Sequence, residues 1–264
     1  MSTRLSDYDY PLPKELIADR PLRQRDASRM MVLRRDSQRI EHRQFRDFKA
    51  LLEPGDLLVL NDTRVLSARS FSDDRAIEFL FVERLEPRRW KCLVKPGRKM
   101  RVGATAVVDN VRLCVDEILA DGERIITFER DIDPYARGAM PLPPYIGRES
   151  GAEDDARYQT VFARAPGALA APTAGLHFTP ETLREMPQTF LTLHVGPGTF
   201  RPVQTEDVRQ HQMHPEWFAI SANAARDINH AQRIVAVGTT TARVLESARR
   251  EHGQLVAQTG STDL

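Results

Sequence analysis

Two short loops hold the residues of this chain whose types and spacing could do chemistry. Residues 171–178 and 193–200 each place one histidine, His177 or His194, beside glycine, proline and threonine at the end of an apolar run. Glycine permits backbone conformations and close approaches that other residues do not, so such loops suit ligand binding better than core packing. A histidine can exchange a proton near neutral pH. We interpret the loops as walls of one crevice; the alternative is that each histidine is a hydrogen-bonded structural residue.

Polar residues also follow the apolar run 57–60. Asn61, Asp62, Thr63 and Arg64 come directly after it. A buried strand that ends in polar residues delivers their side chains to the edge of a sheet. These four residues form a third candidate wall, although Asn, Asp and Thr equally favour a capped turn.

A fourth candidate wall lies at residues 238–241, where Gly238 and three threonines follow the apolar run 233–237. A strand, a glycine and hydroxyl groups at the start of a helix form a cradle for a carboxylate or a phosphate. The Gly-Lys pair of a P-loop is absent. A carboxylate or phosphate is therefore the ligand group that we expect here.

Residues 211–218 contain two histidines and a glutamate. The three-residue step from His211 to His214 could suit a pair of metal ligands, but Pro215 would end a helix there. No carboxylate lies at the zinc-protease spacing. We therefore expect no metal site.

Short apolar runs alternate with helical patterns in the parts of the chain that hold these loops. Strands are expected at residues 30–33, 57–60, 190–193 and 233–237, all but the third buried, and helical segments at 14–18, 44–52 and after Gly238. Thr179 and Pro180 predict a helix start, with threonine as the N-cap and proline at the first helical position. Phe178 and Leu183 would form its hydrophobic staple.

The sequence pattern changes from about residue 67 to residue 141. Short runs rich in β-branched and aromatic residues are separated by turns without helical patterns, which is typical of a small antiparallel barrel or sandwich. The fold class that we predict is an α/β main domain with an inserted small antiparallel β-barrel domain. The main domain comprises residues 1–66 and 142–264, and the insert residues 67–141.

The insert contains a local basic run in a chain whose formal charge is only +1, from 38 basic and 37 acidic residues. A net charge this close to zero gives no overall electrostatic attraction to nucleic acid, so any RNA binding must come from a local patch. Solvated surface is the alternative explanation of the run. The candidates for contacts with phosphates are Arg88, Arg89, Lys95, Arg98 and Lys99.

Several classes of protein are disfavoured. Cys92 and Cys114 form no CxxC pair, which fits a reducing compartment. No signal peptide or run of about 20 apolar residues is present, so we expect a cytoplasmic protein with no membrane segment. No Gly-x-Gly-x-x-Gly follows a strand, which disfavours a methyltransferase. The residues leave two classes, a small-molecule transferase or hydrolase using His177 and His194, and a non-catalytic RNA-binding protein using the barrel.

Seven segments of the chain, in order, resemble the S-adenosylmethionine:tRNA ribosyltransferase-isomerase (QueA) family of queuosine biosynthesis. They are residues 62–64, 141–145, 158–160, 171–178, 194–203, 211–217 and 237–247. The resemblance runs from Asp7 to Leu264. It implies a further segment after Leu264 that includes Thr-Asn-Phe-His-Leu-Pro, and longer loops after Ser70, around residues 186–188 and around residues 230–231, so a wall of the crevice is expected outside this sequence.

The resemblance implies an unusual use of S-adenosylmethionine as a ribosyl donor. The acceptor would be the aminomethyl group of 7-aminomethyl-7-deazaguanine (preQ1) at the wobble position of tRNAs with GUN anticodons. The products would be epoxyqueuosine in tRNA, adenine and methionine. S-adenosylmethionine would then be a substrate, and we expect no cofactor and a monomeric enzyme.

This reaction needs a base near the acidic ribose C5′, a proton donor to adenine and a neutral acceptor amine. We expect His177 or His194 to be the base and the other histidine to assist. Asp62 could hold the amine or the sulfonium, and Arg64 could bind the methionine carboxylate or a phosphate. The expected substrate-binding residues are Asn61, Thr63, Thr173, Ala174, Gly175, Gly196, Gly198, Thr199, Phe200, His214, Glu216, Gly238, Thr239 and Thr240.

Overall fold

The computed structural model describes residues 2–200 and 202–264, and the chain divides into two compact units. The first unit comprises Met1–Arg64, Pro144–Arg148 and Arg157–Leu264; the second comprises Val65–Pro143 and Glu149–Ala156. The expected boundaries differ at residues 65–66, 142–143 and 149–156, which belong to the second unit and not to the main domain. None of the helices in the described residues is long and apolar enough to cross a membrane.

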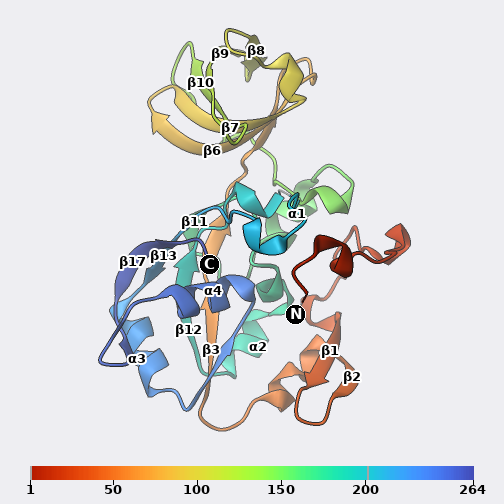
Figure 1. The fold of residues 1–264 in the computed structure, drawn as a ribbon, viewed down its shortest axis with the longest axis vertical. Helices are drawn as coiled ribbons and strands as arrows, with labels where there is room; N and C mark the ends of the chain where they lie inside the picture. The colour runs from red at the N-terminus through yellow and green to blue at the C-terminus, as the bar shows by residue number, and fades with distance from the viewer. Residues whose placement is uncertain (1, 201) are drawn as a thin grey trace. The chain divides into compact units, whose positions relative to one another are not determined.

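A five-stranded mixed sheet is the centre of the first unit, with the order β14-β3-β12-β13-β17 (Figure 1). Strands β14, β3 and β12 run parallel, while β13 and β17 run antiparallel to their neighbours. Their bounds are β3 Asp56–Asn61, β12 Gln188–Leu193, β13 Glu216–Ile220, β14 Arg233–Ala236 and β17 Gln258–Thr262. Because the carboxyl ends of parallel strands meet at one edge, the segments after β14, β3 and β12 begin there.

Apolar side chains on both sides of the sheet hold it in place. Helices α3 (Ala222–His230) and α4 (Thr239–Ser247) contact β3 and β12. Leu58 and Leu60 of β3 belong instead to a buried cluster with Phe178 and Leu183. Thr179 caps helix α2 (Pro180–Arg184) by accepting the Thr182 N–H, as its sequence predicts. The histidine loop at residues 171–178 is thereby anchored on the core at its end.

Shorter elements complete the first unit and its boundary with the second. The helical spacing at residues 44–52 forms a 3-10 helix, η4 (Phe45–Leu51), rather than an α-helix. The other short helices are η1 Leu5–Tyr8, η2 Lys14–Leu16, η3 Arg25–Ala27, η6 Pro144–Ile146, α1 Ala152–Arg157, η7 Thr173–His177, η8 Pro197–Phe200 and η9 Val208–Gln210. The other short strands are β1 Arg29–Arg34, β2 Arg39–Gln44, β4 Thr63–Val65, β11 Ala165–Ala168, β15 Arg250–Glu251 and β16 Gln254–Leu255. Elements α1 and β4 extend across a boundary between the units.

Two strands are where we expected them but are not buried. Residues 30–33 lie in β1, which pairs only with β2 in a two-stranded hairpin, so Met31 is 60% and Leu33 64% exposed. Residues 233–236 form β14 at the edge of the main sheet, where Ile234 is 37% exposed. The expected burial was wrong, because an apolar run predicts a strand but not how many strands or helices pack against it.

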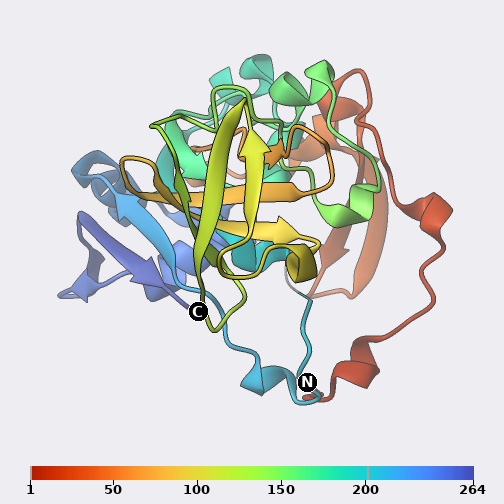
Figure 2. The same ribbon diagram turned by 90° about the horizontal axis from the view of Figure 1, so that it is seen from above.

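The second unit is a nearly closed antiparallel barrel, as predicted for the insert. Its six strands have the order β5-β6-β7-β10-β9-β8. The Asp73 N–H, just after β5, donates to the Val107 carbonyl of β8 at 2.8 Å and brings the two ends of the sheet together. The strands, orange to yellow-green in Figure 2, are β5 Arg69–Phe71, β6 Glu78–Glu86, β7 Arg89–Lys95, β8 Thr105–Val108, β9 Val111–Ile118 and β10 Arg124–Phe128. Phe79, Phe81 and Trp90 are buried in its core.

Candidate active site

Asn61 joins the carboxyl ends of β3 and β12. Its Nδ2 donates to the Leu193 carbonyl at 2.9 Å, and its Oδ1 accepts the Leu193 N–H at 3.0 Å and the Thr63 N–H at 3.1 Å. The side chain is 1% exposed. The amide predicted to bind substrate is thus bonded within the protein, where it aligns the two strand ends.

Asp62 is also tied to its surroundings, and it lies beside the second histidine loop. Its Oδ1 accepts the Thr192 hydroxyl at 2.6 Å, and its Oδ2 accepts from Arg164 at 3.0 Å. Arg64, two residues on, is exposed and forms no side-chain hydrogen bond or ion pair with any described residue. Of these two candidates, Arg64 has the freer side chain.

His194 has a well-defined environment at the end of β12. Its Nδ1 lies 2.8 Å from the Thr63 hydroxyl, and its ring stacks on Trp217 with centroids 4.9 Å apart. A Cβ added to Gly167 would come within 2.6 Å of Nε2, so only glycine fits beneath the ring. Burial lowers the pKa of His194 below the ordinary 6.5, and the negative charge of Asp62 opposes that shift. The shift favours the neutral ring, which can accept a proton.

His177 lies among different neighbours. Its ring centroid is 5.2 Å from that of Phe45, and Arg25 donates to the adjoining Leu176 carbonyl at 3.0 Å. Burial lowers the pKa of His177, with the Arg25 charge adding to the shift and a hydrogen bond to the Arg25 backbone opposing it. Among these contacts, no residue touches both His177 and His194, so the two rings have different neighbours.

A pocket of about 420 Å³ lies at the carboxyl edge of the main sheet, and we call it the strand-edge pocket. Its walls come from the loop after β12, the segment before β13 and the start of α4. Neither His177 nor His194 lines it, so the two histidines do not share this crevice. Its walls include six predicted binding residues: Gly198, Thr199, His214, Glu216, Thr239 and Thr240.

The first turn of α4 meets the first histidine loop. Gly238, with φ of +86°, precedes the helix, and a Cβ there would come within 3.2 Å of the Ala174 Cβ. Gly175 is similarly confined, since a Cβ would lie 2.9 Å from atoms of Phe162 and Thr160. Gly175 is buried, while Thr173 is exposed and Phe200 half-buried. The 173–177 loop therefore reaches the carboxyl edge through Ala174 and Gly238.

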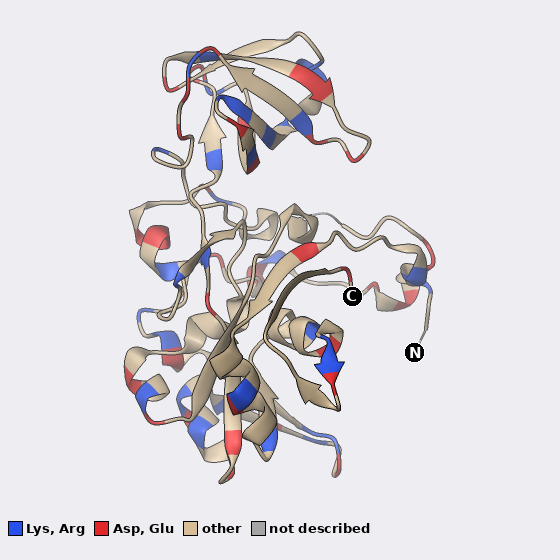
Figure 3. Ribbon diagram, turned by 90° about the vertical axis from the view of Figure 1, so that its left-hand side faces the viewer, with Lys and Arg blue, Asp and Glu red and all other residues tan. Residues whose placement is uncertain are grey.

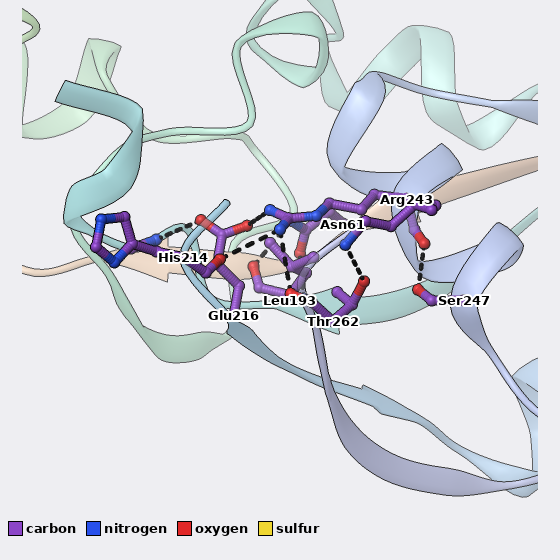
Figure 4. Close-up of polar contacts among 9 residues, drawn as sticks. Asn61, Leu193, His214, Glu216, Arg243, Ser247 and Thr262 are labelled. Atoms are coloured by element: carbon purple, nitrogen blue, oxygen red, sulfur yellow. Dashed lines mark hydrogen bonds and ion pairs between the residues drawn. The ribbon is translucent and has the colours of Figure 1, made fainter. Parts of the chain in front are cut away.

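A buried ion pair lies in the wall of the strand-edge pocket (Figure 4). Glu216 accepts the Gly196 N–H at 2.7 Å through Oε1 and pairs with Arg243 through Oε2. Arg243 also donates to the carbonyls of His214, at 3.2 Å, and Thr262, at 3.1 Å. The sequence analysis missed Arg243, because an arginine in an amphipathic helix is ordinarily exposed and nothing local distinguishes this one.

Six basic residues of the barrel form two clusters, and acidic residues lie among the basic ones on the barrel (Figure 3). In the hairpin cluster, defined as Arg84, Arg89 and Lys91, each cation has an acidic partner: Arg84 pairs with Asp131, Arg89 with Glu86 and Asp116, and Lys91 with Glu83. Arg88, in the same hairpin, donates to the Glu129 carbonyl. In the η5 cluster, defined as Lys95, Arg98 and Lys99 around η5 (Gly97–Lys99), every side chain is exposed and none forms an ion pair with a described residue.

The fold and site define an α/β protein with an inserted barrel and a pocket at the carboxyl edge of its main sheet, lined partly by glycine- and threonine-containing loops. The chain belongs to the queuosine biosynthesis protein family, whose model matches residues 5–264.

The chain is also similar to relatives whose names fit this family. The S-adenosylmethionine:tRNA ribosyltransferase-isomerase of Thermotoga maritima is 46% identical over 279 residues, which cover 99% of this chain and 81% of the relative. Its namesake from Symbiobacterium thermophilum is 47% identical over 283 residues, covering 99% and 82%. A crystal structure of S-adenosylmethionine tRNA ribosyltransferase from Thermotoga maritima is 36% identical, covers 98% of this chain and 78% of its own, and has a TM-score of 0.46.

Proposed function

We propose that this chain is an S-adenosylmethionine:tRNA ribosyltransferase-isomerase. It transfers and isomerises the ribosyl moiety of S-adenosylmethionine onto the aminomethyl group of preQ1 at the wobble position of a GUN-anticodon tRNA. The products are epoxyqueuosine in tRNA, adenine and methionine. The observation that carries the proposal is the strand-edge pocket, whose walls contain twelve residues from the segments that resemble this family, six of them predicted binding residues.

The strand-edge pocket is the site for S-adenosylmethionine in this proposal. Its volume of about 420 Å³ is within the range of small-molecule sites. The first-turn N–H groups of α4, at Thr239 and Thr240, suit the carboxylate of the methionine part. The Glu246 carboxylate in the wall favours a cationic group such as the ammonium or the sulfonium.

His194 is the better supported of the two candidate bases. The loop that begins with it contributes Val195, Gly198 and Thr199 to the strand-edge pocket, whereas His177 packs against Phe45. Burial lowers the pKa of both histidines and favours the neutral form that a base requires, so the preference for His194 rests on its position beside the pocket loop. In this scheme His194 removes the C5′ proton and His177 assists proton transfer, with Asp62 and Arg64 in the roles given above.

The η5 cluster is the part of the barrel that would hold tRNA. None of its cations forms an ion pair with a described residue, although the charge of Lys99 helps to lower the pKa of Asp74. These side chains are therefore available to phosphates, which fix position without reading sequence. The proposal includes no cofactor, a monomeric enzyme and action in the cytoplasm.

The test is to incubate the protein with S-adenosylmethionine and tRNA that contains preQ1. We expect equal amounts of released adenine and methionine, together with the matching mass gain on the tRNA. The same tRNA with guanine at the wobble position is the control and should give neither product. Binding of S-adenosylmethionine without adenine release or modified tRNA would contradict the proposed function.

A further inference from the structure

Arg243 connects three segments that are far apart in the sequence. From α4 it pairs with Glu216 of β13, and it donates to the carbonyls of His214 and Thr262 (Figure 4). Through Glu216 Oε1 it also reaches the Gly196 N–H in the loop after β12. The side chains of this ion pair are 13% and 7% exposed, so the network is largely shielded from solvent.

Each anchored backbone group lies beside residues that line the strand-edge pocket. The anchored Gly196 is flanked by Val195, and the anchored His214 itself lines the pocket. Thr262 lies two residues before Leu264, which closes another part of the wall. The segments that form the pocket are therefore the segments that the ion pair holds.

The carboxylate of Glu216 is fully engaged within the protein, since one oxygen accepts an amide and the other pairs with Arg243. A buried ion pair of this kind contributes little net stability, because desolvation offsets the attraction between the charges. What this pair supplies is geometry, since a guanidinium presents its donors in a fixed fork that can hold several acceptors at once.

We propose that Arg243 is the positioning residue of the strand-edge pocket. With Glu216 as its relay, it holds the 195–199 loop, the 211–214 segment and the end of β17 in the arrangement that binds the donor. Glu216 acts through the backbone it fixes and does not bind substrate itself. The identity of the bound molecule, S-adenosylmethionine, rests on the proposed function; the positioning role rests on the contacts.

The decisive variant replaces the pair with apolar residues, Arg243→Met together with Glu216→Leu. No unpaired charge is left behind, so the fold should persist, while the three segments lose their common anchor. The matched control is Arg233→Met with Asp56→Leu, which removes an arginine-carboxylate pair with contacts of 2.6 and 2.5 Å at the amino ends of β14 and β3. A third variant, Arg243→Lys, keeps the charge but lacks the fork.

The measurements are the affinity for S-adenosylmethionine by calorimetry, kcat and KM for adenine release, and hydrogen exchange at the Gly196 amide. In the double variant we expect affinity to fall roughly 10- to 100-fold, the scale on which misplacement of about 1 Å acts. KM should rise more than kcat falls, and the Gly196 amide should exchange faster. Arg243→Lys should give intermediate values, and the control pair should leave affinity within about twofold.

The outcomes separate the two proposals. If the wild-type protein does not bind S-adenosylmethionine, the proposed function fails, and Gly196 exchange still decides whether Arg243 holds the loop. If the wild type binds it but the double variant keeps its affinity and its Gly196 protection, the positioning role is overturned. The role is also overturned if the control pair weakens binding as much as the Arg243 pair, because the effect would then be general destabilisation.

Discussion

Thr63 and His194 meet through one contact, with the Thr63 hydroxyl 2.8 Å from His194 Nδ1. Thr63 is two residues past β3 and His194 one residue past β12, and these strands are parallel neighbours. Thr63 is fully buried. Because Trp217 stacks on the same ring, the imidazole is held against its face by Trp217 and at its Nδ1 edge by Thr63. The Thr63 contact biases which ring nitrogen is free to accept a proton.

Thr63→Val should therefore lower kcat for adenine release. Valine keeps the shape but removes the hydroxyl, and a typical hydrogen bond contributes about 0.5–1.5 kcal/mol, which corresponds to roughly a 2- to 12-fold loss. KM for S-adenosylmethionine should hardly change, because Thr63 does not line the strand-edge pocket. Thr63→Ser, which restores the hydroxyl, should recover most of the activity. An unchanged kcat in Thr63→Val would mean that the contact does not serve catalysis.

The stability of the protein should fall as the pH drops below about 6.5. The pKa values of His177 and His194 are both lowered in the folded state, chiefly by burial. The unfolded chain then binds protons that the folded chain does not, so this contribution is present above the unfolded pKa of about 6.5 and is lost as the pH falls below it.

Urea unfolding at pH 5 and pH 7.5 measures this effect. The wild-type protein should lose more free energy of unfolding between the two pH values than a His177→Asn, His194→Gln double variant. His42, an exposed histidine of β2, provides the control variant His42→Gln. Equal losses in the wild type and the double variant would show that the two buried histidines do not determine the acid response.

Gly167→Ala should displace His194. Its φ of +153° is a conformation that other residues rarely adopt, and the new Cβ would lie 2.6 Å from Nε2. Gly253→Ala is the control, since Gly253 also has a positive φ, of +81°, but nothing within 4 Å of the added Cβ. Both variants should lose stability, by about 1 kcal/mol or more, while Gly167→Ala alone should lose activity. Equal activity in the two variants would argue against a catalytic role for His194.

The η5 cluster should account for the salt dependence of tRNA binding. Replacing Lys95, Arg98 and Lys99 by glutamine should reduce the slope of log K against log salt by roughly 2, if each contact with a phosphate contributes about 0.7 to 0.9. The matched control replaces the hairpin cluster by glutamine and should change the slope little, because its charges are already paired. Filter binding over a salt series measures both slopes. A larger effect from the hairpin cluster would assign the tRNA surface to the other group.

Local patterns in the sequence predict the type and order of several elements of each unit, although β13, β17 and α3 were not expected. The apolar runs at residues 57–60 and 190–193 lie in β3 and β12, and the threonine-proline pair at 179–180 starts α2. The closely spaced short strands of the insert form the barrel. Six of the binding residues expected from residue type and motif position line the strand-edge pocket.

Which of these residues meet depends on the tertiary fold. An apolar pattern of period 2 or 3.6 residues indicates which face of a strand or helix is apolar, but not what packs on that face. The exposure of β1 and β14 could therefore not be predicted from their apolar runs. The partners of Arg243 lie 19 to 29 residues away in the chain, and the acidic partners of Arg84 and Lys91 come from other segments of the barrel sequence. Such pairings arise from strand order and register, which depend on contacts between distant segments and leave no local signal.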